Sequence, residues 1–156
     1  MEAPTLICSP DARWSCQLAK DWSIDLPDSV GRVSKPYTFR VERPEQFCRE
    51  WLHLDSEGRL TIFAGYATDG CSMVPDFPKA LPGCILHDAL RQAATLDKAR
   101  CPWTRAEADH IFRRVLIAFG FNFWGSWLFY LGVAGPTGWI YSWLKSLLKP
   151  AIDRAC

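Results

Sequence analysis

The 156-residue sequence lacks the short patterns that assign many proteins to a function class directly. It has no CxxC pair, and the closest cysteines, Cys8 and Cys16, do not have the spacing of a zinc ribbon or knuckle. It has no run of like charge, and 18 basic against 17 acidic residues leave a net charge of +1. This balance argues against the broad basic surface of a nucleic-acid-binding protein, so no nucleic-acid partner is expected.

No export signal is expected, because Met1 to Pro4 offers neither a basic start nor a following apolar run. Seven cysteines are many for this length, and an odd number cannot all pair within one chain. Without an export signal, we expect reduced and mostly buried thiols rather than a disulfide framework.

The composition and length predict one folded domain, residues 1–156, since 49% hydrophobic and 22% charged residues are typical of a globular chain. The first half, residues 1–75, is expected to be β-rich, with one or two helical turns over Glu45 to Leu52. The expected strands are Arg13 to Leu18, Tyr37 to Val41 and Arg59 to Ala64.

The second half, residues 84–150, is predicted to be helical. Apolar residues recur at helical spacing from Cys84 to Thr95, and a T-x-x-E capping box at Thr104 and Glu107 opens the next helix. A last helix is expected from Trp139 to Leu147. The prediction is therefore an α+β fold, with a small N-terminal antiparallel sheet or hairpins followed by a bundle of three to four helices.

The stretch from Val115 to Leu144 has no charged residue, and Val115 to Val133 is long enough to cross a bilayer. Gly120 and Asn122 predict a break within it, which favours a packed or interfacial pair of aromatic helices, with membrane association through residues 115–149. Eight tryptophans are more than a core of this size needs. We expect membrane or partner contact from Trp124, Trp127, Trp139 and Trp143.

The residues that suggest chemistry are His87, Asp88 and Asp109, which fall on the first two predicted helices. If those helices pack antiparallel, Asp109 can approach His87. A carboxylate that orients an imidazole fixes its tautomer and raises its basicity, as a general base requires. The alternative is structural: Asp109 acts as a first-turn acid, and the three side chains form a buried polar network.

Asp88 would then be available to bind a cation. Hard cations such as Ca²⁺ take mixed carboxylate and carbonyl oxygens, and carbonyls near Gly65 and Gly70 would complete such a site. Asp69 and Ser72 lie in the same loop and are further candidates, although an Asp-Gly step is also common turn chemistry.

Three ordered motifs resemble a family of phage proteins, domain of unknown function 1353. They are a loop from Gly65 to Pro75 (GYATDGCSMVP), His87 to Leu90 (HDAL) and Ala108 to Phe112 (ADHIF). The resemblance implies a phage-encoded protein in the host cytoplasm or the virion, and it implies no particular activity.

A second, looser resemblance is to the phospholipase A2 domain of parvovirus capsid proteins, through the spacing of His87-Asp88 and Ala108-Asp109 and the stretch Phe119 to Asn122. It implies that His87 is the general base for a water, Asp88 a calcium ligand and Asp109 the residue that orients His87. Where that superfamily has a tyrosine four positions after the histidine, this sequence has Arg91, which could pair with Asp109.

Three functions follow as hypotheses. The first is a calcium-dependent hydrolase of phospholipid esters, with a variant in which Ser72 is the nucleophile of a triad with His87 and Asp109. The second is a non-catalytic tail, baseplate or host-interaction protein. The third is a membrane-active lysis protein that uses Val115 to Leu144. A cell-wall hydrolase with Asp69, His87 and Asp109 as metal ligands is a further alternative.

Overall fold

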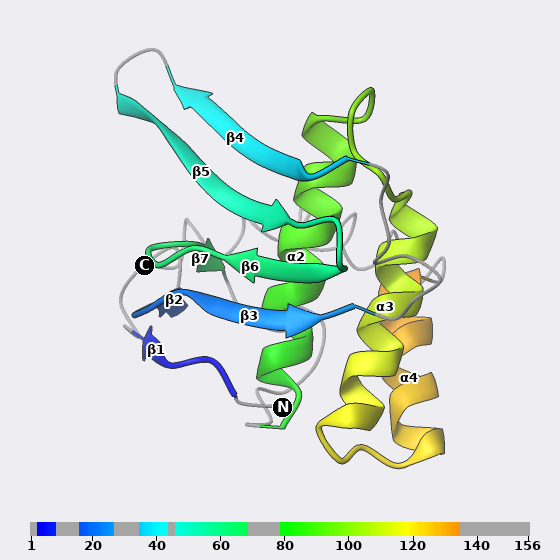
Figure 1. Ribbon diagram of the computed structural model, residues 1–156. Helices are drawn as coiled ribbons and strands as arrows, with labels where there is room; N and C mark the ends of the chain where they lie inside the picture. Colours follow the sequence, from blue (N-terminus) through cyan, green and yellow to red (C-terminus); the bar gives the residue numbers. More distant parts are fainter. Residues whose placement is uncertain (1–2, 9–15, 27–34, 44–45, 69–78, 135–156) are drawn as a thin grey trace, which may run out of the picture.

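The computed structural model describes residues 3–8, 16–26, 35–43, 46–68 and 79–134 (Figure 1). The predicted α+β fold is confirmed, with antiparallel sheets in the N-terminal half followed by three helices. The last expected helix, Trp139 to Leu147, lies outside the described residues.

Two antiparallel sheets make up the N-terminal half. The larger has the strand order β3-β6-β5-β4, and the smaller has the order β1-β2-β7. Their strands are β1 (Leu6–Cys8), β2 (Cys16–Leu18), β3 (Trp22–Asp25), β4 (Tyr37–Arg43), β5 (Gln46–Leu54), β6 (Arg59–Ile62) and β7 (Ala67–Thr68). The strands expected at Tyr37 to Val41 and Arg59 to Ala64 correspond to β4 and β6.

The helical turns expected over Glu45 to Leu52 are wrong, because most of this segment is strand β5. Leu52 and Leu54 alternate with more exposed residues and are both buried. They pair with Ile62 and Leu60 of β6 across the ladder. Strand β5 pairs with β4 on one side and β6 on the other. This pairing stabilises the extended conformation of a segment whose local sequence does not specify a strand.

The C-terminal half consists of α2 (Leu81–Leu96), α3 (Arg105–Ala118) and α4 (Phe123–Ala134). In Figure 1, α2 crosses behind the larger sheet, and α3 runs beside it in the opposite direction. Helix α2 begins three residues before the predicted Cys84, because Pro82 is tolerated in a first helical turn, where its missing N–H would have no partner.

The capping box predicted at the start of α3 is present. The Thr104 side chain accepts a hydrogen bond from the Glu107 backbone N–H at 3.2 Å, and the Glu107 carboxylate accepts one from the Thr104 N–H at 2.7 Å. These two bonds fix the first residue of α3 and hence the position of Asp109 one turn later.

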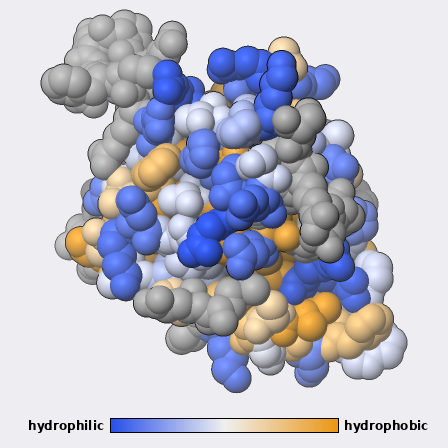
Figure 2. Space-filling view, viewed as in Figure 1, coloured by the Kyte–Doolittle hydropathy of each residue, from blue (hydrophilic) through white to orange (hydrophobic). Residues whose placement is uncertain are grey.

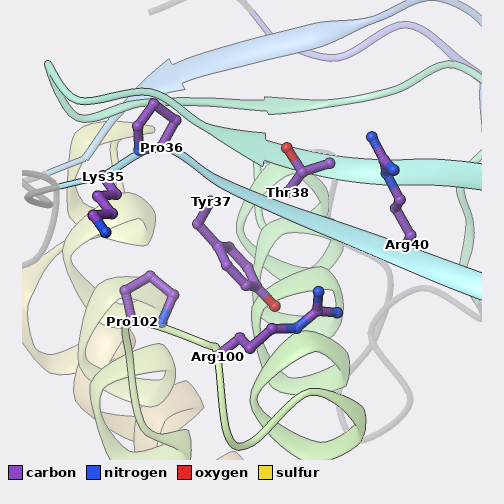
Figure 3. A pocket seen from close by; sticks show the side chains of 7 residues that line it. All are labelled: Lys35, Pro36, Tyr37, Thr38, Arg40, Arg100 and Pro102. Atoms are coloured by element: carbon purple, nitrogen blue, oxygen red, sulfur yellow. The ribbon is translucent and has the colours of Figure 1, made fainter.

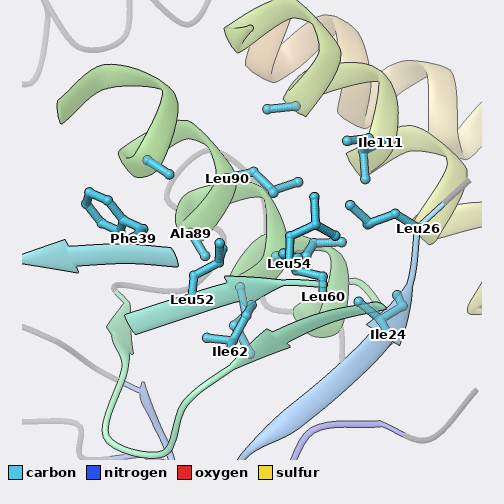
Figure 4. Packing of buried hydrophobic residues seen from close by; sticks show 14 of the residues in the cluster. Ile24, Leu26, Phe39, Leu52, Leu54, Leu60, Ile62, Ala89, Leu90 and Ile111 are labelled. Carbon is cyan, nitrogen blue, oxygen red and sulfur yellow. The ribbon is translucent and has the colours of Figure 1, made fainter. Parts of the chain in front are cut away.

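The main core lies between the larger sheet and α2, and α3 closes it at one side. Figure 4 shows Leu52, Leu60 and Ile62 of the sheet facing Ala89 and Leu90 of α2. Ile111 of α3 joins the same cluster. A second cluster joins the start of α2 to α3 and α4; its buried members are Ala80, Cys84, Phe112, Leu116 and Phe129.

The break predicted at Gly120 and Asn122 separates α3 from α4. Gly120 has a φ of 90°, and the N–H groups of Gly120 and Phe121 bond to the carbonyls of Ile117 and Leu116, which is a Schellman ending. Asn122 then caps α4, accepting a hydrogen bond from Gly125 N–H at 2.6 Å. Within residues 3–134 as described, no helix is long and apolar enough to cross a membrane.

The cysteines do not follow the expected pattern. Cys16 and Cys84 each take part in a disulfide, so the prediction of reduced thiols is wrong for these two residues. Cys101 is a free, half-buried thiol.

Candidate functional site

Helices α2 and α3 bring His87 and Asp109 into direct contact. His87 Nε2 lies 2.7 Å from Asp109 Oδ1, and the two residues are only 6% and 5% exposed. The helices approach closely because Gly83 lies one turn before His87. A Cβ at Gly83 would lie 3.0 Å from Leu116 Cδ2 and 3.2 Å from Phe112 Cε2. His87 and Asp109 were predicted to lie on separate helices, and the packing of α2 against α3 brings their side chains together.

The hydrogen bond fixes the tautomer of His87. An ionised carboxylate can only accept, so the proton of a neutral imidazole must lie on Nε2. Nδ1 then carries a lone pair and no proton. Its nearest acidic neighbour among the described residues is Asp88, whose Oδ1 lies 3.9 Å away, beyond hydrogen-bonding distance. The arrangement therefore presents an oriented imidazole with one basic nitrogen.

The His87 ring is also held by packing. The Phe112 ring lies 4.8 Å from it between centroids, at an interplanar angle of 37°. Phe112 is buried and follows Asp109 by three residues, so one face of α3 supplies both the acceptor and the aromatic contact. Together they restrain both the position and the rotation of the imidazole.

Arg91 reaches the same carboxylate. Its Nε lies 3.3 Å from Asp109 Oδ1, the oxygen that also bonds to His87. Arg91 lies one turn after His87 on α2, and its side chain is 38% exposed. The contact gives the buried carboxylate a cationic partner in addition to its hydrogen bond with His87.

Asp88 faces the smaller sheet, where its Oδ2 accepts a hydrogen bond from the Thr68 hydroxyl at the end of β7. Thr68 is buried, and sequence reasoning did not single it out. Its position immediately before Asp69 in the loop motif was the only signal that could have drawn attention to it. The contact joins the end of β7 to α2 beside His87.

The described residues do not form a metal site. Within them, no group of three or more His, Cys, Asp or Glu side chains could hold an ion. The Gly65 carbonyl accepts a hydrogen bond from Gln17 Nε2 at 3.0 Å. Asp69, Gly70 and Ser72 lie outside the described residues. The single carboxylate of Asp88 falls short of the oxygen ligands that Ca²⁺ takes, so the described residues alone do not fit a calcium site.

The predicted contact tryptophans differ from one another. Trp124 is exposed on α4, whereas Trp127 packs against α3 with the Arg113 guanidinium 4.2 Å from its ring centroid. Trp139 and Trp143 lie outside the described residues.

A hollow of about 550 Å³ lies at the other end of α2, between β4 and the α2–α3 connection (Figure 3). Lys35, Arg40 and Arg100 line it, and two of these cations are paired with acids, Arg40 with Glu50 and Arg100 with Asp97. Burial raises the pKa of Tyr37 far above its usual value, so its hydroxyl stays protonated and donates to Asp97. Burial likewise raises the pKa of Cys101, which keeps this thiol a weak nucleophile. His87 is therefore a better candidate for a reactive group than Tyr37 or Cys101 in this hollow.

Comparison with known proteins places these residues in a family. A family model described as a protein of unknown function (DUF1353) matches residues 48–133, which run from β5 to α4 and include His87, Asp88 and Asp109. Comparison with curated proteins and with solved structures gives no match. Because the family model covers more than half of the 156 residues, the chain belongs to this family of proteins of unknown function.

Proposed function

We propose that this protein is a hydrolase in which His87 activates a water molecule for attack on an acyl ester. The observation that carries the proposal is the 2.7 Å contact from His87 Nε2 to Asp109 Oδ1, which leaves Nδ1 as the basic nitrogen. Its geometry is that of an oriented general base, and such a base contributes roughly 10²- to 10⁴-fold to a reaction rate.

In the proposed reaction, Nδ1 takes a proton from water as the water oxygen bonds to the acyl carbon. The imidazolium that forms is stabilised by Asp109, which faces its other nitrogen. The tetrahedral intermediate then collapses as its bond to the ester oxygen breaks. The imidazolium returns the proton to that leaving oxygen. The products are a carboxylic acid and an alcohol, and His87 regains its starting tautomer.

The substrate class comes from the resemblance to the viral phospholipase A2 domain, which favours a phospholipid ester. The phage origin implied by the family motifs belongs to the same proposal. The resemblance also predicts Ca²⁺ beside Asp88. This prediction needs ligands beyond the described residues, and the proton transfers of His87 do not require the ion.

A second function is favoured by a specific observation, the deep burial of both His87 and Asp109. A buried imidazole and carboxylate, with the partly exposed Arg91 guanidinium as a further partner of the carboxylate, can instead fix the packing of α2 on α3. The protein would then be a non-catalytic virion or host-interaction protein.

The proposal is tested by assaying the purified wild type and Ser72→Ala on phosphatidylglycerol vesicles and on a soluble p-nitrophenyl ester, with Ca²⁺ or with chelator. We expect both proteins to release product on at least one substrate, because water rather than Ser72 is the nucleophile. In H₂¹⁸O the released acid should carry the label, and no acyl-enzyme should accumulate in a rapid-mixing experiment.

Absence of hydrolysis on both substrates in both conditions would favour the structural role. Loss of activity in Ser72→Ala, together with an initial burst in the wild type, would replace the general-base reaction with a serine nucleophile.

A further inference from the structure

We propose that the exposed face of α4 docks on the surface of an anionic lipid bilayer. The inference goes beyond the hydrolase proposal and does not depend on it, because it rests on a different helix and on different residues.

Helix α4 is apolar on both of its faces, and the residues that the structure describes cover one of them. Ser126 and Phe129 are buried, and Phe129 packs with Phe112 and Leu116. The opposite face carries Trp124, Leu128 and Leu131, which are 79%, 71% and 55% exposed. In Figure 2, apolar residues gather at the lower right, over the region of α3 and α4. A helix that is apolar all round is expected to be covered on every side.

The exposed residues lie on one line of the helix. Trp124, Leu128 and Leu131 are four and three residues apart, so their side chains fall within one narrow stripe. No residue from Phe123 to Ala134 is charged. The 12 residues of α4 span roughly 18 Å, well short of the 30 Å hydrocarbon core of a bilayer. The geometry therefore fits a helix lying in the plane of the membrane surface.

The positive charge near α4 in the sequence favours an anionic bilayer as the partner of this face. Between residues 110 and 152 the sequence has four basic residues, Arg113, Arg114, Lys145 and Lys149, and no acidic one. The chain as a whole is nearly neutral, so the stretch of sequence that includes α4 has a local excess of positive charge. Basic residues beside an apolar aromatic helix are attracted to anionic headgroups, and tryptophan favours the level of those headgroups.

Aromatic packing holds one of these cations beside the face. The Arg113 guanidinium lies 5.0 Å from the Phe123 ring centroid and 4.2 Å from that of Trp127. Trp127 in turn packs edge-on against Tyr130. Trp127 thus supports the cation, and Trp124 is the tryptophan of the docking face.

The test is flotation of the wild-type chain with two kinds of vesicle, one of phosphatidylcholine alone and one with a third of phosphatidylglycerol. We expect binding to the anionic vesicles that weakens at high salt, and at least tenfold weaker binding by Leu128→Asp. The matched control is Leu96→Asp, since Leu96 is 64% exposed at the end of α2, away from α4; it should bind as the wild type does.

Three results would overturn the proposal. The first is equal binding by the wild type and Leu128→Asp. The second is a wild-type dimer that dissociates in Leu128→Asp, without vesicle binding, since a second copy would then cover the face. The third is a wild type that binds no vesicles, together with a lower melting temperature for Leu128→Asp than for the wild type and Leu96→Asp. The chain's own residues would then cover the α4 face. Retained binding in His87→Gln, with hydrolysis lost, would separate docking from catalysis.

Discussion

Replacing His87 by glutamine is expected to reduce ester hydrolysis by about 10²- to 10⁴-fold, the contribution of a positioned general base. Glutamine suits this experiment because its side-chain amide can still donate a hydrogen bond to Asp109, as the imidazole does at 2.7 Å. It has no nitrogen that can accept a proton from water at neutral pH. The variant therefore removes the base while retaining a buried partner for the carboxylate.

The measurement is the steady-state rate constant kcat/KM, together with the thermal midpoint of unfolding for each protein. His110→Gln is the matched control, since His110 is exposed on α3 and stacks on Tyr130. We expect its rate to equal that of the wild type. If His87→Gln hydrolyses the ester at the wild-type rate, His87 is not the base, and its contact with Asp109 serves packing alone.

Replacing Asp109 by asparagine is expected to lower kcat by about 10²- to 10⁴-fold with little change in KM. Two physical effects act together. Asparagine has no charge with which to stabilise the imidazolium. Its amide can also donate to Nε2, which would move the ring proton to Nδ1 and remove the base. Asp109 is therefore a positioning residue that acts through His87.

Asp97→Asn is the control for this change, because the Asp97 side chain is also largely buried and bonds both to Arg100 and to Tyr37, at the other end of α2. Its loss should affect stability without lowering the rate. If Asp109 served only the packing of the helices, its replacement would change stability and leave the rate unchanged. Asp109→Asn would then lower the melting temperature while the kcat of the folded protein stayed at the wild-type value.

Much of the helical half could be predicted because its signals are local. A Thr-x-x-Glu box satisfies the backbone groups at the start of α3 by itself, and the Schellman ending at Gly120 needs only one residue of positive φ. Strand β5 could not be predicted in the same way. Glu45 to Leu52 takes its conformation from pairing with β4 and β6, which the segment alone does not encode.

The cysteines illustrate the same limit. Whether a thiol is oxidised depends on which elements the fold brings within bonding distance, and the spacings of Cys16 and Cys84 in the sequence do not contain that information. The absence of a CxxC motif argues against some metal sites, and it leaves open disulfides between cysteines at other spacings.

Within the candidate site, helical spacing was enough to suggest that Asp109 approaches His87. The roles of Thr68 and Gly83 could not be predicted. Thr68 contacts Asp88 only because β7 ends beside α2, and Gly83 matters because α3 packs directly on it. Both depend on how separate elements pack.

The most direct test of the central claim is the protonation of the His87 ring nitrogens, measured by ¹⁵N NMR at neutral pH. The chain has three histidines, so single substitutions of His53 and His110 assign the spectrum. We predict a proton on Nε2 and none on Nδ1 for His87, with this preference lost in Asp109→Asn. A ring protonated on Nδ1 in the wild type, or one unchanged by Asp109→Asn, would contradict a base oriented by Asp109.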